Sequence, residues 1–234
     1  MKGAVAGAAG VSGLAIAGTA FFNQHHAAKA ASAYTPDSAA TILSIAATAE
    51  QLAITFYTHG IKYAHRLEIS GQNLSYLTAA VEEEQYHLNL LVAAGGKPVA
   101  NKFSFPFGEA TFQNQHKFIK TLDQLETAFE SAYLAAIRDF AYLGLPDYAV
   151  LAGQIVTVEA EHRALGRSID ASIPTANNWA FTPVYVKSVA DAANVLAAEG
   201  YLSPTADNHY TYVPTSLTIN TDVTQKKPFV TPYM

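Results

Sequence analysis

Apolar side chains recur along four stretches of the chain at alternating spacings of three and four residues. These stretches cover residues 43–64, 74–91, 119–140 and 148–169. Such spacing is typical of helices that bury one face along the seam of a bundle. The pattern therefore predicts four long helices after Pro36, the fourth with the loosest repeat.

The segments between the predicted helices differ in length. Residues 69–71 join the first two helices, and Gly144-Leu145-Pro146 joins the last two, with glycine after one helix and proline at the start of the next. Such short links make neighbouring helices antiparallel, whereas residues 95–117 are long enough to run along a whole bundle. We therefore expect an all-α fold over residues 36–170, built from two antiparallel hairpins and one long crossover.

The first 35 residues form a separate segment. Lys2 precedes an uncharged stretch over residues 3–22, and Ala31-Ser32-Ala33 offers small residues for cleavage, which is the outline of an export signal. We therefore expect a secreted or cell-surface protein. The alternative is an uncleaved membrane anchor or assembly helix, since Gly3 and Gly7 have the spacing of a close helix contact.

Residues 171–234 form a third segment, rich in tyrosine, threonine and proline. The pattern predicts a short helix over residues 187–199, ended by Gly200, and short strands over residues 210–213 and 217–220. Two interpretations remain open for this extension. It is either a strap packed over the bundle or, because exposed tyrosines favour interfaces, a surface for self-association.

The composition excludes several classes of protein. Only 14% of the residues are charged, the formal net charge is -5, and there is no cysteine. Disulfide frameworks, thiolate metal sites and thiol nucleophiles are therefore excluded, so that any metal must be held by oxygen and imidazole ligands. The 14 basic residues form no cluster, which argues against a nucleic-acid partner.

Each predicted seam carries one glutamate near its middle. A buried carboxylate is costly unless a cation accompanies it, and none of the seam positions is Lys or Arg. On two of the helices a histidine follows the seam glutamate by three residues and so shares its face. One glutamate from each of two helices and Glu-x-x-His from each of the other two make the ligand set of a dimetal site in a bundle core. The predicted metal ligands are Glu50, Glu84, His87, Glu126, Glu159 and His162.

An internal repeat selects the acid on the third helix. Tyr57 follows Glu50 by seven residues, and Tyr133 follows Glu126 by seven residues, whereas Glu130 has no matching tyrosine. We therefore choose Glu126 over Glu130 as the ligand. Seven residues span about 10 Å along a helix, so both tyrosines are expected beyond direct metal contact. We predict them as catalytic candidates that lie beside the ligands or take part in redox chemistry.

The remaining histidines and acids receive structural interpretations. His59 and His65 fall on the first helix, where a surface or hairpin-end position is expected. Glu82, Glu83 and Glu161 flank the two Glu-x-x-His motifs, and we expect them in solvent or beside a ligand.

The chain resembles the ferritin-like domain family that includes secreted, desiccation-related and stress-associated proteins. The resemblance covers about residues 36–170, and it implies a ferritin-like four-helix bundle with a dimetal carboxylate site. No Arg-Arg pair is present, although many relatives use one for export. The long C-terminal segment also differs from the short fifth helix of cage ferritins, so iron storage in a shell is not expected. The resemblance rests on residues 49–57, 83–91, 95–96, 103–106, 125–133 and 159–162.

Two functions from different classes follow. The first is an oxidoreductase that holds two iron ions, or alternatively two manganese ions, and acts on dioxygen or peroxide. In that interpretation Glu84 and Glu159 bridge the metals, Glu50 and Glu126 are terminal, and each histidine binds one ion. The second is an extracellular structural or assembly protein in which the metal only stabilises a scaffold.

Overall fold

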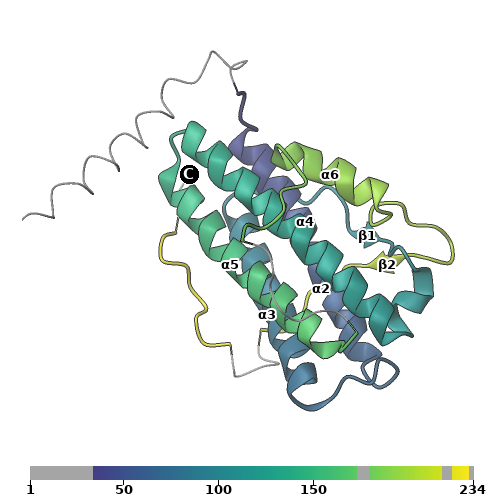
Figure 1. Cartoon of the computed structure of the whole chain (residues 1–234). Coiled ribbons are helices and arrows are strands. Elements are labelled where there is room, and N and C mark those ends of the chain that lie inside the picture. Colours follow the sequence, from purple (N-terminus) through teal and green to yellow (C-terminus); the bar gives the residue numbers. More distant parts are fainter. Residues whose placement is uncertain (1–33, 173–179, 218–222, 232–234) are drawn as a thin grey trace, which may run out of the picture. The chain divides into compact units, whose positions relative to one another are not determined.

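The computed structural model describes residues 34–172, 180–217 and 223–231. Four long antiparallel helices form a bundle, which confirms the predicted fold class (Figure 1). The two hairpins, α2 with α3 and α4 with α5, make the most extensive helix contacts. The bundle helices are α2 (Ala39–Lys62), α3 (Gly71–Ala93), α4 (Gln115–Tyr142) and α5 (Pro146–Ile169).

Local sequence signals determine where the helices begin and end. The Ser38 hydroxyl accepts a hydrogen bond from the Thr41 amide at 3.1 Å, and Asn114 caps α4 in the same manner. Gly144 has a φ of 71°, a left-handed conformation that ends α4 directly before Pro146 opens α5. These signals produce the tight link that holds α4 and α5 antiparallel.

The crossover between α3 and α4 is tied to the C-terminal segment. It contains β1 (Lys102–Phe103) and the 3-10 helix η2 (Gly108–Phe112). β1 pairs antiparallel with β2 (Tyr210–Thr211), so the strand predicted at residues 210–213 is confirmed in shortened form, with a partner that the sequence did not suggest. The strand predicted at 217–220 falls almost entirely outside the described residues.

The short helix predicted in the tail is confirmed as α6 (Val189–Ala198), with Gly200 after its end at a φ of 90°. α6 packs against α2 and α4 and buries Val189 and Leu196. Tyr201 is fully buried behind it. The described part of the extension therefore belongs to the same compact unit as the bundle, which spans Pro36–Met234.

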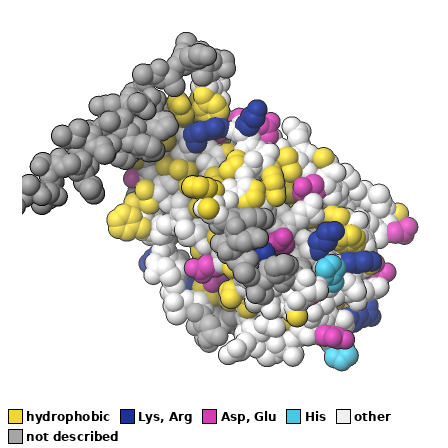
Figure 2. Space-filling view, viewed as in Figure 1, with side chains coloured by type: hydrophobic (Ala, Val, Ile, Leu, Met, Phe, Trp, Pro, Cys, Tyr) yellow, Lys and Arg dark blue, Asp and Glu magenta, His cyan; other side chains and the backbone are white. Residues whose placement is uncertain are grey.

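The low content of charged residues is visible on the surface of the protein. Figure 2 shows charged side chains in small scattered groups over one face, in keeping with the low content of charged residues.

Among the described helices α2 is long and apolar enough to cross a membrane, but 67% of its most apolar stretch is buried inside the bundle. The predicted export signal or anchor lies in residues 1–33, outside the described residues.

Candidate metal centre

All six predicted ligands meet in the interior of the bundle. The four glutamates come one from each helix and are at most 1% exposed. His162 on α5 is 2% exposed, whereas the His87 side chain on α3 is 13% exposed. The spacing of three residues within each Glu-x-x-His motif places the carboxylate and the imidazole on the same face of the helix.

The ligand atoms form two overlapping groups. One group joins Glu50, Glu84, His87 and Glu159, and the other joins Glu84, Glu126, Glu159 and His162. The ligand atoms within each group lie within 4.8 Å of one another. Since Glu84 and Glu159 belong to both, the geometry offers two neighbouring cation positions with two shared carboxylates.

The two imidazoles face the shared carboxylates through their Nδ1 atoms. His162 Nδ1 lies 3.1 Å from Glu84 Oε1 and 3.3 Å from Glu159 Oε2. His87 Nδ1 lies 3.2 Å from Glu84 Oε2 and 3.6 Å from Glu159 Oε1. Each imidazole therefore contacts both shared carboxylates.

Burial and crowding alter the protonation of this cluster. Burial raises the pKa of Glu126 and of Glu159, and the charges of neighbouring glutamates raise it further. Burial lowers the pKa of His87 and of His162, but hydrogen bonds and charges from the surrounding glutamates outweigh it, so both pKa values are raised. The cluster thus favours added positive charge, whether as protons or as metal ions.

The residues fit a pair of divalent cations. Several buried atoms that face the cluster form no hydrogen bond of good geometry within the described residues, namely one oxygen of Glu84, one of Glu126, both of Glu159, and Nδ1 of His162. An unsatisfied buried acceptor is costly, and a cation at each position would satisfy these atoms. Carboxylate oxygens with imidazole nitrogens suit iron, manganese or zinc, so chemistry and geometry agree on a metal site.

Tyr57 and Tyr133 bond across the bundle. Tyr57 on α2 donates to Glu126 Oε1 on α4 at 2.5 Å. Tyr133 on α4 donates to Glu50 on α2. Burial and the neighbouring carboxylate raise the pKa of each tyrosine well above its ordinary value, so both hydroxyls keep their protons. Each tyrosine therefore orients the glutamate of the opposite hairpin.

Two further groups support His162. Glu83 accepts at 2.9 Å from Nε2 of His162, a contact that fixes the ring and leaves Nδ1 facing the cluster. The Tyr76 hydroxyl donates to the His162 carbonyl at 2.6 Å and lies 3.2 Å from the Tyr57 hydroxyl. The sequence prediction placed Glu83 among residues in solvent or beside a ligand but missed Tyr76. Its position, eight residues and about two turns before Glu84, was the available signal.

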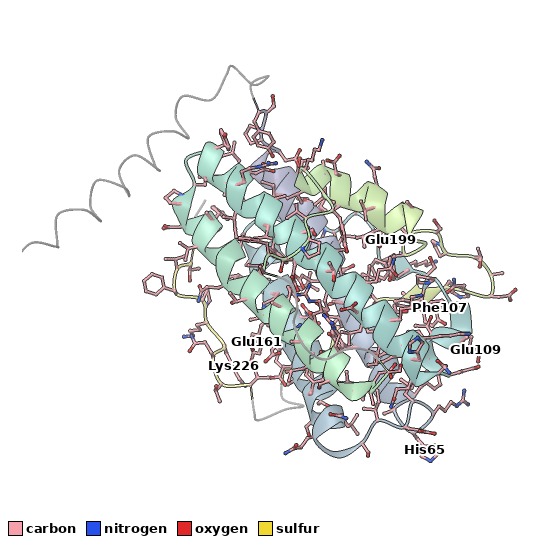
Figure 3. All side chains as sticks on the ribbon, in the orientation of Figure 1. His65, Phe107, Glu109, Glu161, Glu199 and Lys226 are labelled. Carbon is pink, nitrogen blue, oxygen red and sulfur yellow. The ribbon has the colours of Figure 1, made fainter. Side chains whose placement is uncertain are left out.

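Glu130, set aside during ligand selection, has a different partner. It is 1% exposed and lies 3.1 Å from Nε of Arg163, a buried cation that the seam pattern did not include. Glu82 is also fully buried, which corrects the expectation of a solvent position, and it lies 3.5 Å from Nζ of Lys226. Glu161 is exposed on α5 (Figure 3).

Three further histidines of the described residues lie away from the cluster. His65 is exposed at the link between α2 and α3, as expected (Figure 3). His59 packs against Phe112 and Tyr210. His116, in the first turn of α4, pairs with Asp170 at 2.7 Å.

Comparison with known proteins agrees with this architecture. Residues 38–171, more than half of the chain, match the ferritin-like domain family. The chain belongs to this family. No match is found among curated proteins or solved structures. The ferritin-like domain spans the whole bundle, from the cap of α2 to the end of α5, and its buried acidic and imidazole cluster is the candidate metal site. The assignment of each of these six residues as a metal ligand stays a prediction. All six lie in the cluster at the centre of the bundle.

Proposed function

We propose that this ferritin-like protein is a dimetal oxidoreductase that acts on dioxygen or peroxide. The observation that carries the proposal is the pair of overlapping ligand groups with two shared glutamates, Glu84 and Glu159. When bound there, two iron(II) ions would supply two electrons, enough to reduce dioxygen to hydrogen peroxide, or hydrogen peroxide to water, with uptake of two protons. Manganese is the alternative metal.

The protein's own residues hold and orient the site. Glu84 and Glu159 belong to both ligand groups and would be shared by the two metal ions, and four carboxylates would balance the charge of two divalent ions. The hydroxyls of Tyr57 and Tyr133 hold protons against Glu126 and Glu50, which fixes the outer carboxylates. Apolar side chains on all four helices surround the cluster and limit the entry of water.

The test is a titration of the purified full chain with iron(II) under anaerobic conditions, followed by addition of dioxygen or peroxide. We expect about two equivalents per chain, because the ligands form two groups. Glu84→Ala removes a ligand from both groups and is expected to abolish binding of the pair. His87→Ala removes a ligand from one group and is expected to leave one tight site.

Glu161→Gln is the matched control, since it alters an exposed glutamate one residue before His162. It should bind and react as the parent does. A parent chain that binds no more than trace metal would contradict the proposal. A chain that binds two ions but consumes neither oxidant would favour the alternative function, a scaffold stabilised by metal.

Export and self-association are proposals that rest on sequence alone. We propose that residues 1–35 direct the chain to the cell surface or anchor it in a membrane, and that this segment or the tyrosine-rich extension mediates self-association. The intact mass of the mature protein tests the first proposal, because retention of Met1 would contradict a cleaved signal.

A further inference from the structure

Two apolar cavities lie at one end of the bundle. The larger, with a volume of about 20 Å³, lies between α2, α4 and α6. The smaller, with about 10 Å³, lies among α2, α3, α4 and α5. Both are lined by Ile42, Ala46, Tyr133 and Ala136. The two cavities are therefore neighbours, separated by small side chains.

The smaller cavity lies next to the metal centre. Its lining includes Ala46, Leu91 and Ile155, which lie four residues from Glu50, His87 and Glu159 respectively. Four residues along a helix correspond to about 6 Å. Tyr133 lines both cavities and donates to Glu50, so it connects the cavity walls to the ligand set.

The lining selects an apolar occupant. Nearly all residues around the larger cavity are alanine, valine, leucine or isoleucine. The Tyr133 hydroxyl donates to Glu50, so the Tyr148 hydroxyl, which has no partner among the described residues, is the one hydroxyl in the lining of the smaller cavity left to bind a polar occupant. A buried water needs two to four polar partners, and hydrogen peroxide likewise loses hydrogen bonds in apolar surroundings. A small apolar molecule loses none.

We propose that these cavities hold dioxygen and deliver it to the half of the metal centre formed by Glu50 and His87. This inference rests on the proposed function and deepens it, because it selects dioxygen over peroxide as the oxidant. The larger cavity beneath α6 takes up the gas, and the smaller cavity passes it beside Tyr133 to the ligands. The apolar lining disfavours peroxide, so the two oxidants should respond differently when the cavities are filled.

Occupancy is tested without any reaction, by nuclear magnetic resonance of the full chain prepared with zinc in place of iron. Dissolved dioxygen is paramagnetic and broadens the signals of nearby methyl groups, whereas nitrogen at the same pressure does not. We expect the methyl signals of Ala46 and Ala136 to broaden several-fold more than that of Ala80. Ala80 is a fully buried alanine of α3 that lines neither cavity. Equal broadening of all three would overturn the proposal.

Delivery is tested by Ala136→Leu, which fills the space between the cavities. Ala135→Leu is the matched control, because Ala135 is a buried neighbour on α4 that lines neither cavity. With the iron-loaded protein we expect Ala136→Leu to raise the KM for dioxygen about tenfold, equivalent to about 1.4 kcal/mol. The KM for peroxide and the iron stoichiometry should match those of the parent.

The outcomes separate this inference from the proposed function. Equal changes with both oxidants, or the same change in Ala135→Leu, would overturn dioxygen delivery through the cavities while the oxidoreductase stands. If the parent consumes neither oxidant, the proposed function fails, and the broadening measurement alone decides whether the cavities hold dioxygen.

Discussion

The two helical hairpins supply matching candidate ligands but surround them differently. Glu50, Glu84 and His87 in the first hairpin correspond to Glu126, Glu159 and His162 in the second. The residues next to the ligands do not correspond in character. Tyr76 and Glu83, which support His162 from α3, have Leu151 and Val158 as their counterparts on α5.

The two hairpins also differ in polarity one helical turn after the predicted ligand glutamates. The buried pair Glu130 and Arg163 belongs to the second hairpin. At the corresponding positions of the first hairpin stand Ile54 and Leu88, both buried. The repeat therefore preserves the predicted metal ligands, whereas the neighbouring positions differ in polarity between the hairpins.

Because of this difference, the two cation positions have distinct surroundings. His162 is 2% exposed and is held by a carboxylate at Nε2. His87 is 13% exposed and lies one turn from an apolar cavity. We infer that the His162 position is the more rigid and the His87 position the more accessible to a small oxidant. Exchanging residues for their counterparts tests this inference.

The largest effect is expected from Arg163→Leu, which places the first hairpin's residue in the second. Glu130 would then be a buried carboxylate without its cation, and we expect the free energy of unfolding to fall by about 3–5 kcal/mol. Chemical denaturation of the purified chain measures this change.

The double variant Glu130→Ile with Arg163→Leu is the control, since it copies the apolar pair of the first hairpin. Replacing a buried ion pair with packed apolar residues is often neutral or stabilising, so stability should return to the parent value or exceed it. A double variant as unstable as the single one would show that Arg163 acts through contacts other than the one with Glu130.

An intermediate effect is expected from Glu83→Val, which gives His162 the apolar neighbour that the repeat places near His87. Loss of a carboxylate that orients a metal-bound histidine commonly costs about 10–100-fold in metal affinity. We expect that loss for one of the two metal equivalents in a calorimetric titration. Equal weakening of both equivalents would contradict the distinction between the two positions.

The bundle, and the meeting of the six predicted ligand residues at its centre, could be predicted from sequence because both follow from periodicity. An apolar seam reveals a helix, and Glu50, Glu84, Glu126 and Glu159 interrupt it where burial demands a counter-charge. The repeated tyrosine spacing also favoured Glu126 over Glu130, and Glu126 lies at the centre.

The supporting contacts could not be predicted, because they join helices whose relative rotation the seams leave open. Glu83 and Tyr76 on α3 reach His162 on α5, a contact between residues about 80 positions apart. Arg163 lies beside a seam position, yet it is buried because Glu130 faces it from α4. The pairing of β1 with β2 likewise depends on how the C-terminal segment returns to the crossover.

The smallest effect concerns how the C-terminal segment is held on the first hairpin. Gln85 Oε1 accepts from the Tyr212 hydroxyl at 3.1 Å and from the Thr215 amide at 3.0 Å, whereas its counterpart on α5 is Ala160. Gln85→Ala should lower the free energy of unfolding by about 1–2 kcal/mol, through the loss of these hydrogen bonds.

Limited proteolysis tells this local role from a general loss of stability. In Gln85→Ala, tryptic cleavage after Lys226 should quicken, because the segment before it loses its attachment to α3. Asn89→Ala removes the third partner of Gln85 but leaves both contacts with the segment, so its cleavage rate should equal that of the parent. Equal acceleration in both variants would mean that Gln85 stabilises α3 itself rather than the C-terminal segment. The two hairpins would then differ in the residues around their ligands but not in how the C-terminal segment is attached to them.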